Sequence, residues 1–250
     1  MTPFRAGFIN EIIKMQRKSK LVTGAIISLV AAILWQSVLN LIAGGIGVRI
    51  EAPTSFSLSV LSFYTATLLP LFAVFVVIDS FNGEHAANTM KQTLTKPLTR
   101  FGVYSSKVLA VFTFLLFSLL FMMLLTVIIS LLNLGGSFSI AAFMDIAIAY
   151  TVTWLPLAVF LLLVILLAQF TRNGILTFFL SIFSYLVLHG LRIFNPNLAN
   201  LLIVPLFDWY VGWIADISNF GVLLRQSSIL IGTGLLLFGV GCSIFERKDM

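Results

Sequence analysis

The polar side chains that could act chemically are concentrated in one segment, residues 79–107, which lies between two long apolar runs. The segment holds an acid, Glu84, and a proline, Pro97, that is expected to end a short helix. Its cations are Lys91, Lys96, Arg100 and Lys107. A mainly basic segment of this kind is suited to binding another protein or an anionic lipid surface. We therefore expect residues 79–107 to bind a partner and not to catalyse a reaction.

The motifs of common enzyme sites are missing from the sequence. No G-x-x-x-x-G-K-[ST] loop occurs, so the chain lacks the usual phosphate cradle of an ATPase. The only histidines are His85 and His189, and neither H-E-x-x-H nor G-x-S-x-G is present. One cysteine, Cys242, allows no intramolecular disulfide and no cysteine-based metal cluster. We predict no catalytic residue, no metal ligands and no cofactor bound by this chain; an intramembrane enzyme is a minor alternative.

The composition predicts a polytopic membrane protein. Of the 250 residues, 60% are hydrophobic and only 10% are charged, and the mean hydropathy is +1.09. A formal net charge of +6 would suggest nucleic-acid binding in a soluble protein. Here the cations flank apolar runs, where the preference of basic residues for the cytoplasmic side accounts for them. We predict contact with membrane lipid and no nucleic-acid partner.

Six apolar runs have about the length that crosses a membrane, which takes roughly 20 helical residues. The predicted spans are residues 21–43, 58–78, 108–132, 146–169, 175–191 and 229–245. Pro70 and Pro156 are expected to kink the second and fourth spans, because proline removes a backbone hydrogen bond and clashes with the preceding turn. The fold class is therefore all-α, with one transmembrane domain over residues 1–250.

Two further segments are helical but are not predicted to cross the membrane. In residues 4–19, apolar side chains such as Phe8 and Ile12 recur at helical spacing, with charged residues such as Glu11 assigned to the other side. This pattern predicts a helix in the cytoplasmic membrane interface, with a solvated leader as the alternative. Residues 192–227 are interrupted by prolines and rich in Trp and Tyr. We predict that they form an external re-entrant helical hairpin before the last span.

Small residues in the first and last spans are expected to allow close helix contacts, within the chain or with a second copy. Gly24 and Ser28 lie one turn apart in the first span. In the last span glycines repeat every seven residues, at Gly232 and Gly239 and at Gly234 and Gly241.

The distribution of cations predicts the topology. With six spans, only three of the fifteen Lys and Arg residues fall outside, namely Arg49, Arg192 and Arg225. This bias places both termini and residues 79–107 in the cytoplasm. A seventh span through residues 198–207 would move the basic C-terminus outside, and the bias argues against it.

Within residues 79–107 the sequence resembles the signature of type-2 ABC exporter permeases. That family typically shows G-E-x-x-x-G-T, then S-P, R and G-K. The matching residues here are Gly83, Glu84, Thr89, Pro97, Arg100 and Lys107. Asn88, Lys96 and Ser106 depart from the family pattern, which leaves the subfamily open. Residues 245–249, F-E-R-K-D, resemble the closing F-x-R-R-D segment of the same family.

The resemblance implies that residues 79–107 include a coupling helix that docks on a separate ATP-binding subunit. The candidate coupling residues are Glu84, Thr89, Met90, Lys91, Leu94, Pro97, Arg100 and Lys107. Met90 and Leu94, one turn apart, would form an apolar ridge, and Lys91 a rim ion pair. The N-terminal helix would add contacts through Phe8, Glu11 and Ile12.

Glu84 has two further roles open to it. It could pair with Arg100 or Lys107, and it could also stand in the first turn of a helix that begins near Asn82; the two roles are compatible, and we expect both. A solvated loop whose cations fix topology and bind anionic lipid is the alternative for the whole segment.

The resemblance also implies the assembly. The chain would be the permease subunit of an ATP-driven exporter in the bacterial plasma membrane, paired with a second copy or a sister permease. Two ATP-binding subunits would hold ATP and Mg²⁺. Its substrate would be amphipathic or hydrophobic: a drug, an antibiotic peptide or a lipid-like molecule. The alternative is a secondary, ion-driven carrier, although few ionisable residues lie deep in the predicted spans.

Overall fold

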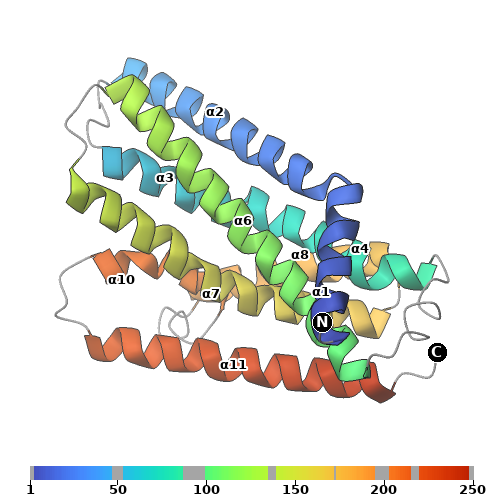
Figure 1. The fold of residues 1–250 in the computed structure, drawn as a ribbon. Coiled ribbons are helices and arrows are strands. Elements are labelled where there is room, and N and C mark those ends of the chain that lie inside the picture. The colour runs from blue at the N-terminus through green and yellow to red at the C-terminus, as the bar shows by residue number, and fades with distance from the viewer. Residues whose placement is uncertain are drawn as a thin grey trace.

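The computed structural model describes residues 3–46, 53–86, 99–134, 139–171, 173–194, 203–214 and 220–247. This part of the chain is helical and contains no strand, which confirms the predicted all-α class. The helices are α1 (Pro3–Arg17), α2 (Lys20–Ile46), α3 (Pro53–Ala66), α4 (Leu68–Ala86), α6 (Arg100–Leu134), α7 (Ile140–Thr171), α8 (Gly174–Phe194), η1 (Val204–Asp208), α10 (Tyr210–Ile214) and α11 (Phe220–Arg247) (Figure 1).

Five of the described helices, α2, α6, α7, α8 and α11, are long and apolar enough to cross a membrane. Helices α3 and α4 together make a sixth candidate if they form one bent span.

Several helices run past the predicted limits. Helix α11 begins at Phe220 rather than at 229, because Ser227 and Ser228 donate to carbonyls within the same helix, of Leu223 at 2.7 Å and of Leu224 at 2.8 Å. Residues 220–227 thus belong to the last helix, not to the external hairpin.

The second span is broken near the predicted proline. Helix α3 ends at Ala66, α4 begins at Leu68, and the two axes differ by 43°. Pro70, in the first turn of α4, lacks the N–H that would continue the helix. Pro156, by contrast, lies inside α7, which continues through it as one helix.

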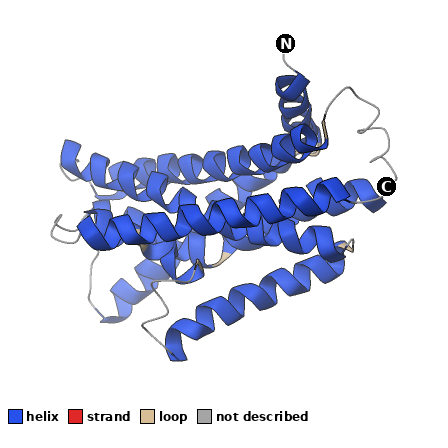
Figure 2. Ribbon diagram, turned by 90° about the horizontal axis from the view of Figure 1, so that it is seen from below, coloured by secondary structure: helices blue, strands red, loops and turns tan. Residues whose placement is uncertain are grey.

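Helix α7 is the centre of the bundle. It packs against α3, α4, α6, α8, α10, α11 and η1, and most of the residues in its apolar stretch are buried. Helices α2, α8 and α11 lie further out, and much of their apolar surface is exposed. Figure 2 shows the long helices sharing one general direction, with α1 projecting away from it. The exposed apolar surfaces suit contact with lipid or another membrane subunit.

Hydrogen bonds between helices satisfy several buried polar groups. The Tyr150 hydroxyl of α7 donates to the carbonyl of Ser57 in α3 at 3.1 Å and lies 3.2 Å from Thr126 Oγ1 of α6. Ser28 of α2 is fully buried and lies 2.8 Å from the Tyr64 hydroxyl of α3. Because lipid offers no hydrogen-bonding partner, these contacts help to fix how α2, α3, α6 and α7 pack.

The small residues of the first span pack within the chain. A Cβ atom at Gly24 would lie 3.2 Å from the Phe114 ring of α6. With the Ser28 contact to α3, this close approach accounts for the first pair of predicted packing residues without a second copy.

The glycines of the last span lie on opposite sides of α11. A Cβ atom at Gly234 would lie 3.3 Å from Val159 of α7, and one at Gly241 would overlap the Tyr104 hydroxyl of α6. At Gly232 and Gly239, no atom of the other described elements lies within 4 Å of the corresponding position. Among the described residues, Gly234 and Gly241 are therefore the pair that makes the close contact within the chain.

Two short helices, η1 and α10, occupy the predicted hairpin segment. Trp209 between them donates from Nε1 to the carbonyl of Val152 in α7 at 3.1 Å, and Asp208 accepts from Ser62 of α3 at 3.0 Å. Burial and the nearby Asp208 carboxylate raise the pKa of Tyr210 to about 12, so its hydroxyl stays protonated at neutral pH. Insertion of these helices into the membrane stays a prediction.

We expect Gly241→Ala to lower the melting temperature of the detergent-solubilised chain, because its methyl group would meet the rigid, fully buried ring of Tyr104. Overpacking of this kind costs about 1–3 kcal/mol. Gly232→Ala, in the same helix, is the matched control and should leave the melting temperature unchanged or slightly higher, because alanine favours a helix. Equal melting of the two variants would contradict the packing described for α11.

Candidate functional site

Seven of the described helices meet at one end of the bundle, which we call the cationic end. It is formed by α1, the start of α2, the end of α4, the start of α6, the junction of α7 with α8 and the end of α11 (Figure 1). Its charged and polar residues include Glu11, Lys14, Lys18, Lys20, Asp79, Ser80, Asn82, Arg100, Lys107 and Glu246. Residues 79–86 and 99–107, the described parts of the predicted coupling segment, lie here.

Lys107 is buried at this end, and its side chain is fully inaccessible to solvent. Its Nζ donates to the carbonyl of Ser80 in α4 at 2.9 Å and lies 3.5 Å from Glu11 Oε2 of α1. It also lies 5.8 Å from the centre of the Phe81 ring. One ammonium group from α6 thus contacts both α1 and α4. Since a charge out of water is costly without partners, these contacts constrain how the three helices pack.

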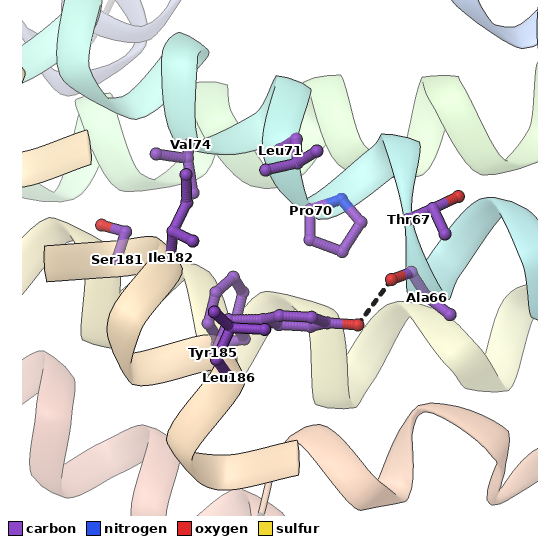
Figure 3. Close-up of a pocket in the computed structure, with 10 residues that line it drawn as sticks. Ala66, Thr67, Pro70, Leu71, Val74, Ser181, Ile182, Tyr185 and Leu186 are labelled. Carbon is purple, nitrogen blue, oxygen red and sulfur yellow. Dashed lines mark hydrogen bonds between the residues drawn. The ribbon is translucent and has the colours of Figure 1, made fainter. Parts of the chain in front are cut away.

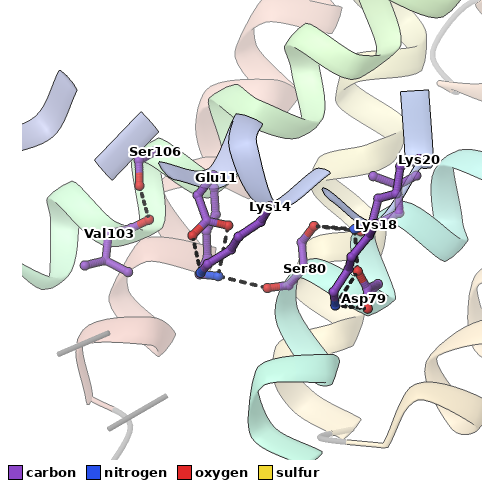
Figure 4. Close-up of polar contacts among 10 residues, drawn as sticks. Glu11, Lys14, Lys18, Lys20, Asp79, Ser80, Val103 and Ser106 are labelled. Atoms are coloured by element: carbon purple, nitrogen blue, oxygen red, sulfur yellow. Dashed lines mark hydrogen bonds and ion pairs between the residues drawn. The ribbon is translucent and has the colours of Figure 1, made fainter. Parts of the chain in front are cut away.

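Glu11 faces the bundle and not the solvent. Its side chain is 7% exposed, and Oε1 accepts a hydrogen bond from Lys14 at 2.7 Å (Figure 4). The prediction that Glu11 lies on the side of the helix opposite Phe8 and Ile12 is wrong, because all three residues face the core. Periodicity treats a charged residue as solvent-facing, but α1 packs against α6, and the buried Lys107 lies opposite Glu11.

A second ion-pair cluster holds the start of α2 against α4. Asp79 accepts from Lys18 Nζ at 2.8 Å and lies 2.5 Å from Lys20 Nζ. The chain turns between α1 and α2 at Ser19, whose φ of 55° is in the left-handed region. This cluster is more open than the first, because Asp79 is 36% exposed. The two clusters lie side by side in Figure 4.

The start of α6 contacts the end of α11. Arg100 Nη1 donates to the carbonyl of Glu246 at 2.6 Å, in the last turn of α11, where backbone carbonyls lack helical partners. Thr99 Oγ1 accepts from the Gly102 N–H at 3.1 Å and so caps the start of α6. The two segments that carried the family resemblance, far apart in the sequence, therefore meet in space.

Asn82 connects α4 to the junction of α7 and α8. Its Nδ2 donates to the carbonyl of Ala168 and to Thr177 Oγ1, both at 3.2 Å. Thr177 also lies 2.5 Å from Thr171 Oγ1. This buried amide thus extends the contacts of the cationic end to the fourth and fifth predicted spans.

Several predicted coupling residues lie outside the described part of the chain, namely Thr89, Met90, Lys91, Leu94 and Pro97. Glu84 lies near the end of α4, so the prediction of a helix that begins near Asn82 is wrong: α4 continues from the span through Ala86. Pairing of Glu84 with Arg100 or Lys107 stays a prediction. In the N-terminal helix, Phe8 and Ile12 are partly buried against the core.

Sequence reasoning missed three contacts of this end: the Asp79 cluster, the Asn82 amide contacts and the Arg100 contact with Glu246. For Asp79 and Asn82 a signal existed, because both are polar residues near the end of an apolar span. The partner of Arg100 is a backbone carbonyl, and no residue type marks such an acceptor.

Among the described residues, no cluster of three or more His, Cys, Asp and Glu side chains could hold a metal ion.

Comparison with protein-family models matches residues 8–188 to the family described as ABC-2 family transporter protein. The match covers most of the 250 residues, from α1 to α8, and includes Glu11, Asp79, Arg100 and Lys107. A comparison with curated proteins finds no match.

We expect Lys107→Met to lower the free energy of unfolding of the solubilised chain by about 3–5 kcal/mol, because it leaves Glu11 without one buried partner. Lys14→Met removes the other, more exposed partner of Glu11 and is the matched control, with an expected cost of at most about 1 kcal/mol. Denaturant unfolding followed by tryptophan fluorescence measures both. A Lys107→Met/Glu11→Gln double variant should lose less than the sum of the single losses; strict additivity would show that the two side chains do not interact.

Proposed function

We propose, because the chain belongs to the ABC-2 transporter family, that it is the permease subunit of an ATP-driven exporter. Its helices are long and apolar enough to span a membrane, and its sequence contains no Walker-type phosphate loop. Membership of the family implies an ABC ATP-binding subunit as partner. The export direction, the cargo and the number of subunits belong to this proposal.

The observation that carries the proposal is the connection of several helices at the cationic end. Residues 87–98 follow directly on α4 and precede α6. Lys107 and Asp79 then link these two helices to α1 and α2, Arg100 links α6 to α11, and Asn82 links α4 to α7 and α8. A partner that moves residues 87–98 would therefore move the connected helices of the bundle together.

In this mechanism the chain supplies the path and its partner supplies the energy. Two ATP-binding subunits would bind ATP and Mg²⁺, and this chain would hold neither. Their closure would displace residues 79–107, and the contacts at the cationic end would pass the displacement to α1, α6 and α11. The broken second span offers a place where that movement could change the path through the membrane.

The outer helices support pairing with a second permease, either another copy or a sister chain. Phe179 and Phe183 of α8 are each more than 60% exposed, and no other described element packs within 4 Å of a Cβ position at Gly232 or Gly239 of α11. These surfaces suit lipid or a second subunit. Since the exposed faces are apolar, a path formed between two such subunits would favour an amphipathic or hydrophobic cargo.

The orientation can be tested by cysteine labelling in a Cys242→Ala background, in cells that express the full chain. Ser139 and Asn173 are exposed and lie at opposite ends of α7. With both termini in the cytoplasm, a membrane-impermeant maleimide should label a Ser139→Cys variant in intact cells and an Asn173→Cys variant only after permeabilisation. The reverse pattern would overturn the orientation.

The docking function can be tested by co-purification with an ABC ATP-binding subunit from the same genome. Met90→Glu and Leu94→Glu should each reduce recovery of that subunit about ten-fold or more, because each places a charge on the predicted apolar ridge. Gln92→Glu is the matched control: it adds the same charge two residues away from each ridge position, on another face of a helix.

Undiminished recovery with both ridge variants would refute the placement of the interface at Met90 and Leu94. Substrate transport that needs an ion gradient, and proceeds without any ATP-binding subunit, would overturn the exporter proposal itself.

A further inference from the structure

Pro70 leaves a backbone carbonyl of the second span without its helical partner. In an α-helix the N–H of each residue donates to the carbonyl four residues earlier, which for position 70 is the carbonyl of Ala66. Proline has no N–H to donate. The span is broken here, where α3 ends at Ala66 and α4 begins at Leu68 with a bend of 43°. In the membrane interior an unsatisfied carbonyl is costly.

The Tyr185 hydroxyl of α8 satisfies this carbonyl. Its oxygen donates to the Ala66 carbonyl at 2.6 Å, and Figure 3 shows the hydroxyl pointing at that oxygen beside the Pro70 ring. The Tyr185 ring is held from two other elements, since its centre lies 5.9 Å from that of Phe160 in α7 and 6.2 Å from that of Phe207 in η1. The donor is thus positioned by packing that does not involve α3.

We propose that Tyr185 is the positioning residue of the broken span: its hydroxyl replaces the hydrogen bond that Pro70 withholds and so sets the angle between α3 and α4. This role links α8 to the one described place where a candidate membrane span changes direction. It rests on the geometry of α3, α4 and α8 alone and does not depend on the proposed function.

A cavity beside the contact gives Tyr185 room to move. It has a volume of about 300 Å³ and lies between α4, α7 and α8. Ala66, Pro70 and Tyr185 are part of its wall, and most of the remaining lining is aliphatic. Side chains in a close-packed interior cannot shift without displacing neighbours, whereas a side chain on a cavity wall can. Loss of this hydrogen bond would therefore let the bend change with little repacking of the neighbouring side chains.

The test measures the bend with spin labels in the full-length chain, purified and placed in lipid nanodiscs. Labels at Ser55→Cys in α3 and Phe75→Cys in α4, both exposed positions, report the distance across the break in a Cys242→Ala background. Tyr185→Phe should broaden or shift the distance distribution. Hydrogen bonds within membranes change such equilibria by about three-fold on average and about twenty-fold at most, so a second population should become visible.

A second substitution separates this role from general packing. Pro70→Ala restores an N–H that can donate to the Ala66 carbonyl, so Tyr185→Phe should have little effect in that background. Ser184→Ala, which removes a hydroxyl from the adjacent residue of α8 that does not line the cavity, is the control and should leave the distribution unchanged.

Two results would overturn the proposal: an unchanged distribution in Tyr185→Phe, or the same change with and without Pro70. If Tyr185→Phe alone does not fold, the Pro70→Ala/Tyr185→Phe double variant should still fold, because its carbonyl has a partner again. Failure of both variants would overturn the proposal too, because phenylalanine keeps the ring and the restored N–H gives the Ala66 carbonyl a partner, so the hydroxyl would have to act in another way.

Discussion

A polar group inside a membrane finds no hydrogen-bonding partner in lipid, so this chain has to satisfy its buried polar groups with other parts of itself. The contacts that do so join separate helices. Lys107 donates to the Ser80 carbonyl beside Glu11, Asn82 donates to the α7–α8 junction, and Tyr185 donates to a carbonyl that a proline left open. Because these contacts join helices, they also determine which helices are held together when the bundle changes shape.

Helix α4 connects the two places where such contacts concentrate. It begins at the break after Ala66 and ends at the cationic end, where Asp79, Ser80 and Asn82 find their partners. Helix α8 contacts both places, through Tyr185 at the break and through Thr177 at Asn82. A displacement applied beyond the end of α4 therefore meets two restraints from α8, one at each end of the same helix. This arrangement suits a subunit that receives movement on one side of the membrane and changes shape within it.

The order of residues in one basic segment was enough to suggest the family, and residues 8–188 match the ABC-2 family model. That order predicted Arg100 and Lys107 as candidate site residues, but it did not predict the directions in which their side chains point. The structure turns Lys107 inward to contact Glu11 and Ser80 and places Arg100 against the last turn of α11. Hydrophobic periodicity placed Glu11 on the side opposite the apolar residues of its helix, because a pattern within one helix carries no information about a buried cation on another.

Composition and local backbone chemistry by themselves determined that the chain is an all-α membrane protein with five or six candidate spans, and that its second span is broken near Pro70. These features depend on residues close together in the sequence. Only the tertiary structure decided which glycine pair of α11 packs within the chain, which side of α1 is buried, and which donor completes the break at Ala66. The hydrogen bond from Tyr185 to the Ala66 carbonyl depends on how α8 is aligned with α3, and its two residues are 119 positions apart in the sequence. No local sequence pattern specifies that alignment.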